Sequence, residues 1–191
     1  PKSVLYLAGL FKDNKKIETK FLDIFAYPDF KQVKRERNNP PIYFGMSDDQ
    51  VVQSIRQYNP HIIAITSTAN YFINDTIKMI ELIRSNFPSV FIVVGGPDAT
   101  NDYKVYFERT NAIDLIVMKE GEVTFEKLVT ALRQGKSWKQ LKGIAYQAND
   151  KMVVTNDQVY VKNLDDYHCD YDLIDLEQYF KINKEGYPSR L

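Results

Sequence analysis

The chain has 191 residues and a mass of 22.2 kDa, which is enough for one domain with a substantial core and a small appendage. Its 25 Lys and Arg residues balance 25 Asp and Glu residues, which argues against nucleic acid or an anionic membrane as the main partner. The single cysteine, Cys169, excludes an internal disulfide, and the lack of a long apolar run or a signal peptide predicts a cytoplasmic protein with no membrane span.

The first part of the sequence predicts a helix, a strand and a loop. Apolar residues at helical spacing predict the helix over residues 3–11, with Ser3 as its N-cap. Residues 20–26 alternate in side-chain character and are interpreted as a strand. Residues 27–46 are rich in Pro, Asn and charge, so we expect a long loop there.

A capping signal predicts the next helix. Ser47 is followed three residues later by Gln50, which is the spacing of a capping box. Apolar side chains on one face continue this helix, and Pro60 disfavours helical backbone at the residue before it. The helix is therefore expected to end near residue 59.

Beyond Pro60, apolar strands alternate with amphipathic helices. The expected elements are a strand at 61–66, a helix at 73–87, strands at 90–94 and 113–118, and a helix that ends at the C-cap glycine Gly135. Residues 61–66 have the composition of a strand that is buried on both faces. Such alternation implies right-handed crossovers, so the predicted fold is α/β: a flavodoxin-like parallel sheet flanked by helices.

The pattern changes after residue 140. Residues 143–146 and 152–155 flank a turn-forming segment and predict a β-hairpin. Residues 163–191 are acidic, aromatic and weakly periodic, as expected of a linker. We therefore expect an α/β domain over residues 1–140, followed by a hairpin and linker over residues 141–191.

Three loops that follow predicted strands form the candidate binding site. In open parallel sheets, ligands bind beyond the carboxyl ends of the strands. Glycines there let a ligand approach the backbone closely, and hydroxyl groups can bond amides or phosphate. The predicted binding residues are Ser67, Thr68, Ala69, Gly95, Gly96, Pro97, Ala99, Thr100, Gly121, Glu122 and Thr124. The alternative is that the Gly-Gly-Pro segment is only a tight turn and that Glu122 merely caps a helix.

Other candidate sites have less support. His61 precedes a strand and is interpreted as a strand-entry residue. His168 beside Cys169 offers two potential ligands in an acidic segment, which is too few for a metal site. The sequence contains no P-loop, no GxGxxG and no Ser-His-Asp order of a hydrolase, so we predict no catalytic and no metal-binding residue.

The pair GGP-x-AT and EGE-x-TF, at residues 95–100 and 120–125, carries a family resemblance. The other matching segments are residues 5–8, 21–24, 59–67, 93–94, 113–114, 141–146, 171–174 and 186–191. With these residues, nearly the whole chain resembles the amino-terminal cobalamin-binding-type domain of radical SAM enzymes. That group includes the anaerobic magnesium-protoporphyrin monomethyl ester cyclase-like proteins and the cobalamin-dependent methyltransferases.

The resemblance implies a cofactor and a division of labour. It implies that this domain is a cobalamin-binding module, and that S-adenosylmethionine and a 4Fe-4S cluster belong to a radical SAM catalytic domain that would follow Leu191. By this resemblance the fragment alone is not an enzyme, whereas its parent is a methyltransferase- or cyclase-like one. Because no Asp-x-His-x-x-Gly motif occurs, cobalamin would bind without a protein histidine on cobalt.

Two departures from the family pattern carry further expectations. The family domain usually opens with an apolar strand, whereas this sequence opens in the first helix, so a central strand is expected to be missing. Either the two flanking strands close up, or a second copy supplies the pairing as a homodimer. Asp98 stands where many relatives have histidine. The absence of a lower-ligand histidine and the presence of Asp98 favour the alternative function: a degenerate domain that binds no cobalamin and packs, as a structural or interaction module, on the catalytic barrel or another partner.

Overall fold

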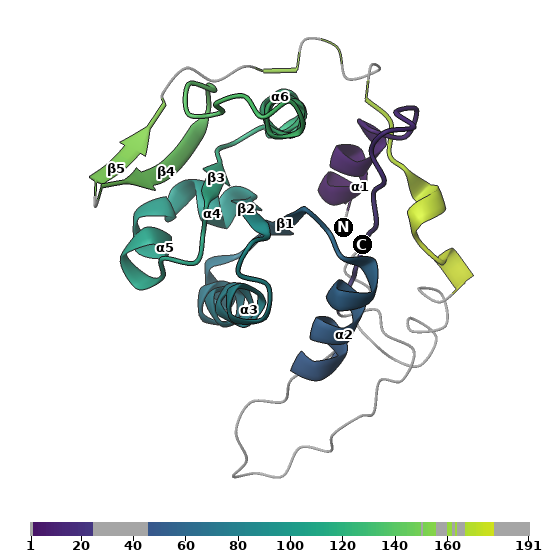
Figure 1. The fold of residues 1–191 in the computed structure, drawn as a ribbon, viewed down its shortest axis with the longest axis horizontal. Helices are drawn as coiled ribbons and strands as arrows, with labels where there is room; N and C mark the ends of the chain where they lie inside the picture. The colour runs from purple at the N-terminus through teal and green to yellow at the C-terminus, as the bar shows by residue number, and fades with distance from the viewer. Residues whose placement is uncertain are drawn as a thin grey trace.

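One mixed sheet organises the part of the chain that the structure describes. The computed structural model describes residues 2–24, 46–149, 151–155, 160–161, 163 and 167–177. The strands follow each other across the sheet and are β1 (Ile62–Thr66), β2 (Phe91–Gly95), β3 (Leu115–Val117), β4 (Ile144–Ala148) and β5 (Lys151–Val154). β1, β2 and β3 are parallel, and β4 and β5 continue the sheet as an antiparallel hairpin (Figure 1). The predicted α/β fold is confirmed, with the hairpin as part of the same sheet.

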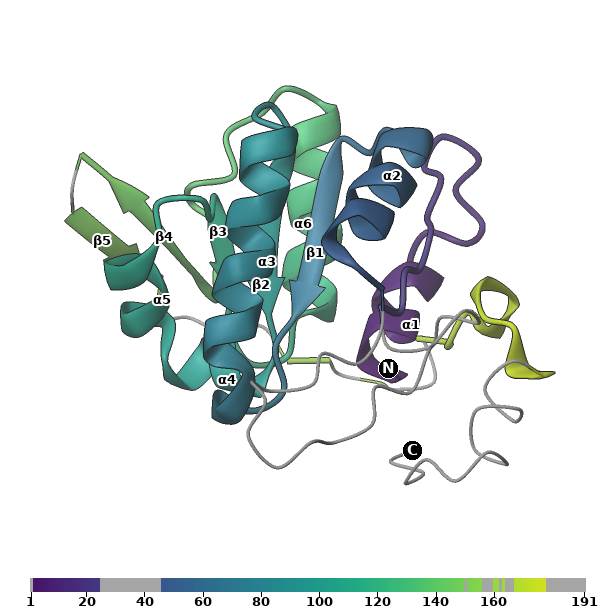
Figure 2. The ribbon, with the colours of Figure 1, turned by 90° about the horizontal axis from the view of Figure 1, so that it is seen from below.

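Helices cover both faces of this sheet. They are α1 (Lys2–Gly9), α2 (Asp48–Tyr58), α3 (Ile73–Asn86), α4 (Pro97–Asn101), α5 (Tyr103–Arg109) and α6 (Glu122–Arg133), with 3-10 turns at Asn70–Phe72 and Tyr171–Leu173. α6 lies on one face, and α3 and α5 lie on the other (Figure 1). α1 and α2 lie beside the β1 edge of the sheet (Figure 2).

The two central strands form the buried middle of the domain. Successive residues of a strand point to opposite faces. In β2, Ile92 and Val94 pack with the residues of α3 and α5, whereas Val93 packs with those of α6. In β3, Ile116 belongs to the first of these clusters and Leu115 to the second. Each of these side chains is at most 2% exposed, so both faces of β2 and β3 are closed to solvent.

The predicted capping box of α2 is present. The Ser47 hydroxyl accepts from the Gln50 amide at 3.3 Å, and the Gln50 side-chain oxygen accepts from the Ser47 amide at 2.8 Å. At the other end, Asn59 takes a left-handed conformation with φ of 52° and bonds back to the Ile55 carbonyl. Local signals therefore fix both ends of α2.

Three details on the amino-terminal side correct the predictions. α1 begins at Lys2, so Ser3 lies inside the helix and is not its N-cap. Residues 20–24 form no strand, and residues 25–45, with most of the predicted loop, lie outside the described residues. β1 is therefore an edge strand among the described elements, with Ala64 and Thr66 exposed, and is not buried on both faces. No gap at the centre of the described sheet is found.

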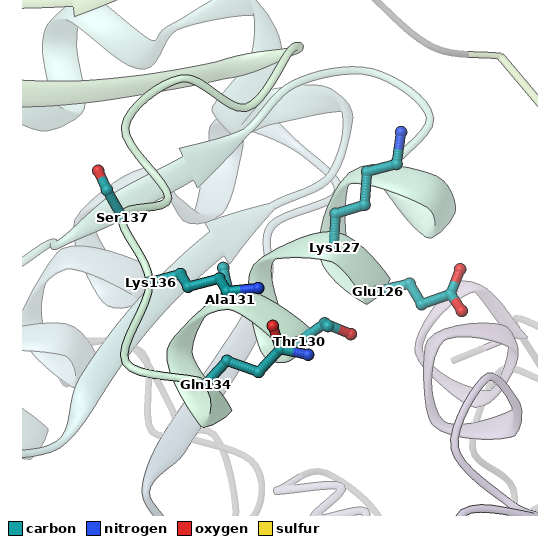
Figure 3. Close-up of a pocket in the computed structure, with 7 residues that line it drawn as sticks. All are labelled: Glu126, Lys127, Thr130, Ala131, Gln134, Lys136 and Ser137. Atoms are coloured by element: carbon teal, nitrogen blue, oxygen red, sulfur yellow. The ribbon is translucent and has the colours of Figure 1, made fainter.

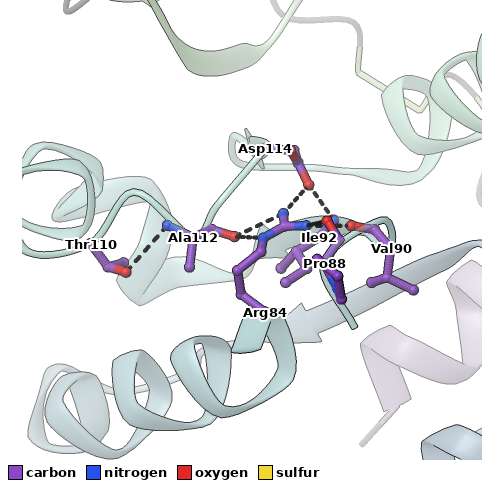
Figure 4. A network of polar contacts seen from close by, with 7 residues as sticks. All are labelled: Arg84, Pro88, Val90, Ile92, Thr110, Ala112 and Asp114. Carbon is purple, nitrogen blue, oxygen red and sulfur yellow. Dashed lines mark hydrogen bonds and ion pairs between the residues drawn. The ribbon is translucent and has the colours of Figure 1, made fainter. Parts of the chain in front are cut away.

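A polar network closes the amino ends of β2 and β3 (Figure 4). The Arg84 guanidinium donates to the carbonyl oxygens of Pro88, Val90 and Ala112 and to Asp114 Oδ2, with distances of 2.5–3.2 Å. Asp114 Oδ2 also accepts from the Ile92 amide at 2.7 Å. The five N–H donors of an arginine are all engaged, so this network is complete.

The carboxyl-terminal linker returns to α1. Lys12 forms ion pairs with Asp170 at 3.0 Å and with Asp172 at 2.6 Å, and these hydrogen bonds raise the pKa of Lys12. The Asp170 amide donates to the Leu5 carbonyl at 3.1 Å. A Cβ at Gly9 would clash with the His168 carbonyl, so a side chain there would lift the linker. Among the described residues, no helix has the length and apolar character needed to cross a bilayer.

Candidate functional site

The three predicted loops meet at the carboxyl edge of the parallel strands. The Ser67 amide, after β1, donates to the Gly95 carbonyl oxygen at 2.9 Å, and the Asp98 amide donates to the Ser67 carbonyl oxygen at 3.3 Å. The loop after β3 joins them, because the Lys119 amide donates to Thr100 Oγ1 at 2.7 Å. The structure thus confirms that these loops lie on one edge, as the parallel order requires.

Only the second glycine of the Gly-Gly pair is required by the backbone. Gly96 has a φ of 99°, and a Cβ there would clash with the Ser67 carbonyl oxygen. At Gly95 a Cβ would lie 3.7 Å from the Val117 carbonyl oxygen, an ordinary contact. The close approach at Gly96 is therefore made by the β1 loop, so the crevice between these two loops is closed at the level of the backbone.

A buried carboxylate lies beneath these loops. Asp98 Oδ2 accepts from Ser67 Oγ at 2.7 Å and from the Tyr106 hydroxyl at 2.6 Å. Ser67 Oγ also lies 2.8 Å from the Tyr106 hydroxyl and 3.4 Å from Thr76 Oγ1. Asp98 is 4% exposed, Ser67 3% and Tyr106 0%. Burial, reinforced by the bond to Asp98, raises the pKa of Tyr106 to about 12.

The other carboxylate oxygen of Asp98 lacks a partner. Within the described part of the chain, Asp98 Oδ1 is buried and has no hydrogen bond. The three neighbouring hydroxyls cannot supply one, because Ser67 and Tyr106 face Oδ2 and Thr76 Oγ1 donates to the Phe72 carbonyl at 3.0 Å. A buried acceptor left without a donor costs about 1–3 kcal/mol.

A second unpartnered oxygen lies on the same edge. Glu122 Oε2, in the first turn of α6, is buried without a hydrogen bond among the described residues. Its neighbour Thr124 donates to the Lys142 carbonyl at 3.0 Å, and Glu120 accepts from the Val161 amide at 3.3 Å. These two carboxylates, Asp98 and Glu122, hold the only buried side-chain polar atoms without a partner in the described residues.

The predicted site residues fall into inward and outward sets. Thr68, Ala69 and Pro97 are exposed on the edge, whereas Ser67, Ala99 and Thr124 are buried. The remaining predicted residues are half-buried, namely Gly95, Gly96, Thr100, Gly121 and Glu122. The hydroxyls of Ser67, Thr100 and Thr124 already bond protein groups, so their capacity to bind a ligand is smaller than their residue types suggest.

Sequence reasoning missed the residues that hold Asp98. Tyr106 and Thr76 lie on α5 and α3, and neither was a predicted site residue. Asp98 itself directly follows the Gly-Gly-Pro segment, which is the one signal that could have pointed to it. The position of Tyr106, eight residues later, has meaning only once α4 and α5 are known to fold back under this edge.

A surface hollow elsewhere is unrelated to the predicted loops. It has a volume of about 390 Å³ and lies on the outer side of α6 and the turn after it (Figure 3). Its lining residues are Glu126, Lys127, Thr130, Ala131, Gln134, Lys136 and Ser137, which include none of the predicted site residues. This hollow is therefore separate from the candidate site at the carboxyl edge.

The two histidines lie away from the candidate site. His61 directly precedes β1 and so lies at the amino end of the strand. His168 is on the linker, with its carbonyl group against Gly9 of α1. Among the described residues, no group of three or more His, Cys, Asp or Glu side chains could hold a metal. The edge therefore offers carboxylate and hydroxyl oxygens and backbone groups, which suit an organic ligand with N–H and O–H donors.

Comparison with known proteins supplies the family. The B12 binding domain family matches residues 1–129. The chain belongs to this family. Within it, the earlier resemblance to cobalamin-binding-type domains of radical SAM proteins is confirmed by relatives of both expected kinds.

Two curated relatives and one solved structure illustrate the match of this B12-binding domain. An uncharacterized methyltransferase, PH0819, from Pyrococcus horikoshii is 29% identical over 150 residues, covering 76% of this chain and 32% of the relative. The anaerobic magnesium-protoporphyrin IX monomethyl ester cyclase of Rubrivivax gelatinosus is 29% identical over 188 residues, covering 95% and 30%. The chain thus spans about a third of the length of these relatives.

The solved structure is of the cobalamin-dependent S-adenosylmethionine radical enzyme OxsB with aqua-cobalamin and S-adenosylmethionine bound. The TM-score is 0.66 with 18% sequence identity, over 84% of this chain and 20% of that one. At this identity the likeness concerns the fold alone, and it agrees with the sheet and helix layers described above.

Proposed function

We propose that this B12-binding domain binds cobalamin at the carboxyl edge of β1, β2 and β3, as an accessory module of a radical SAM enzyme. One observation carries the proposal. Both buried side-chain oxygens that lack a partner in the described residues, Asp98 Oδ1 and Glu122 Oε2, belong to the first turns of α4 and α6, which begin at this edge. Unsatisfied buried groups are uncommon in native proteins, and their gathering at one edge indicates a missing ligand.

The residues present fit a corrin ligand in a limited way. The exposed residues Thr68, Ala69 and Pro97 would contact it, and the glycines behind them would let it approach the backbone. Bound cobalamin would supply methyl-transfer or radical chemistry to the parent enzyme. This chain's own residues would bind and orient it, with no histidine on cobalt from this edge. S-adenosylmethionine and a 4Fe-4S cluster would belong to the catalytic domain of the parent.

Titration of the full chain with hydroxocobalamin tests the proposal. We expect a shift in the corrin absorbance spectrum and retention of corrin by the protein after gel filtration. Thr68→Glu places bulk and charge on the exposed carboxyl edge and should weaken binding at least tenfold. Ser89→Glu makes the same change at an exposed position near the amino ends of the strands and should leave binding unchanged. No spectral shift and no retained corrin at high micromolar ligand would overturn cobalamin binding.

The alternative is a degenerate domain that binds no cobalamin and acts as a structural or interaction module. The direct bonds between the Ser67 and Gly95 loops favour it, because no ligand can enter between them without breaking those bonds. Under this alternative the titration shows no binding while the chain remains folded. The domain boundary at residue 140 and the homodimer stay predictions. For the homodimer, the outer edge of β1 has no strand beside it among the described residues.

A further inference from the structure

Asp98 changes what the carboxyl edge can recognise. Ser67 Oγ donates its single proton toward Asp98 Oδ2, so this serine has no proton left to give to a ligand acceptor such as a phosphate oxygen or a ring nitrogen. The Tyr106 proton is directed at Oδ2 or at Ser67 Oγ in the same way. The hydroxyls that might have bound an acceptor are thus occupied by an acceptor of the protein itself.

What remains is an acceptor without a donor. The two oxygens of a carboxylate diverge, so Oδ1 points away from the hydroxyls that hold Oδ2. Oδ1 is buried and unpartnered within the described residues, and Asp98 as a whole is 96% covered, since its exposed fraction is 4%. A group that supplies an N–H or O–H donor to Oδ1 would remove the cost of leaving this buried acceptor without a hydrogen bond. An anion would instead be repelled by the carboxylate.

Resting on the proposed function, we propose that Asp98 is a specificity-determining residue that accepts a hydrogen bond through Oδ1 from a neutral carboxamide on the rim of the corrin ring. Cobalamin carries primary carboxamides around that ring, each with two N–H donors, and a phosphodiester anion in its nucleotide tail. Asp98 favours the carboxamide and keeps the anionic part of the ligand away from Ser67. Direct contact requires the atoms that cover Oδ1 to shift when the ligand binds.

The ligand itself provides a test that needs no variant. Hydroxocobalamin is compared with derivatives in which one rim carboxamide at a time is converted to a methyl ester or to a carboxylic acid. For the position that faces Asp98, the ester loses the donor and should bind about tenfold more weakly, the equivalent of one charge-assisted hydrogen bond. The acid adds a negative charge facing Asp98 and should bind more weakly still. When a carboxamide at any other position is converted, affinity should not fall in the order amide, ester, acid.

Variants assign the effect to Asp98. Asp98→Asn keeps the shape of the side chain and removes its charge. In this variant the affinity for the acid derivative should therefore be close to the affinity for the amide. Asp102→Asn is the matched control, because Asp102 lies on the same edge but accepts from the Asn70 side chain at 2.5 Å. It should leave the discrimination between acid and amide unchanged. Circular dichroism establishes that each variant is folded.

The outcomes are separable. If hydroxocobalamin does not bind the unmodified chain, the proposed function fails and this inference fails with it. If it binds but every derivative binds within about twofold of it, only the role of Asp98 is overturned. Discrimination that persists in Asp98→Asn also overturns the role of Asp98, whether or not the ligand-side order is seen. If Asp98→Asn does not fold, the order amide, ester, acid on the unmodified chain decides.

Discussion

The two ends of β2 carry polar networks of opposite character. At the amino end, Arg84 and Asp114 form an ion pair whose side chains are 25% and 33% exposed, and all five donors of the guanidinium are engaged. At the carboxyl end, Asp98 is almost fully buried, has no cation beside it among the described residues, and leaves one oxygen unpartnered.

We infer from this difference that the amino-end network is structural and that the carboxyl-end network belongs to the candidate site. A complete network holds loops together and gains nothing from a ligand. A network with an unpartnered buried group stabilises the fold less than apolar side chains in the same place could. We therefore expect such a network where a bound ligand supplies the missing partner. We therefore expect changes at the amino end to alter stability alone and changes at the carboxyl end to alter both stability and binding.

The largest expected effect comes from separating the two loops at the carboxyl end. In Gly96→Ala, a side chain is forced into a backbone region that is almost exclusive to glycine and against the Ser67 carbonyl oxygen. We expect the free energy of unfolding, measured with urea, to fall by about 3 kcal/mol or more.

Two glycines provide matched controls for this change. Gly135→Ala also has a positive φ, of 64°, but open space around the new Cβ, so it should cost only about 1 kcal/mol. Gly95→Ala should cost about as little, because its Cβ meets only an ordinary contact. Equal losses for Gly96→Ala and Gly135→Ala would contradict the close approach of the two loops.

At the amino end, Arg84→Ala should cost about 2–3 kcal/mol of unfolding free energy. It leaves carbonyl oxygens and Asp114 without their donors, and partial exposure keeps the loss below that of a fully buried pair. Arg109→Ala, at an exposed position on α5, should cost less than about 0.5 kcal/mol. Affinity for hydroxocobalamin should be unchanged in both variants. A tenfold loss of corrin affinity in a folded Arg84→Ala protein would contradict the separation of the two ends.

Local signals in the sequence account for most of the fold. The capping box at Ser47 and the glycine at 135 place helix ends because each acts on the backbone of its own segment. The prediction of a strand at residues 20–26 was wrong over the described residues 20–24. Alternating side chains alone do not supply a neighbouring strand for backbone pairing. The exposed edge of β1 follows from the same missing neighbour, which no periodicity within β1 could reveal.

The candidate site was predictable as a location but not as a set of contacts. Parallel strand order places the three loops on one edge, and the structure confirms this. Whether Ser67 turns outward to a ligand or inward to Asp98 depends on Tyr106, which belongs to a helix that the sequence pattern does not predict. The sequence therefore predicted the shared edge of the three loops and missed the bonds that already engage the hydroxyls of Ser67, Thr100 and Thr124.

The smallest expected effect is a pH dependence that arises at the carboxyl end. The pKa of Tyr106 is raised from 10.0 to about 12 in the folded chain, so its phenol binds a proton more tightly there than in the unfolded chain. Its contribution to stability is complete below pH 10 and is lost as the pH rises through 12. Between pH 8 and pH 11 the unmodified chain should lose about 1.4 kcal/mol more than Tyr106→Phe.

The comparison with Tyr106→Phe isolates this one phenol, because every other group titrates in both proteins. Below about pH 9 the difference in unfolding free energy between the two should be constant, since Tyr106 is protonated in both the folded and the unfolded chain there. A difference that stays constant up to pH 11 would mean that the phenol is not buried against Asp98. The hydroxyls around Asp98 Oδ2 would then be free to serve a ligand, and the contrast between the two ends of β2 would disappear.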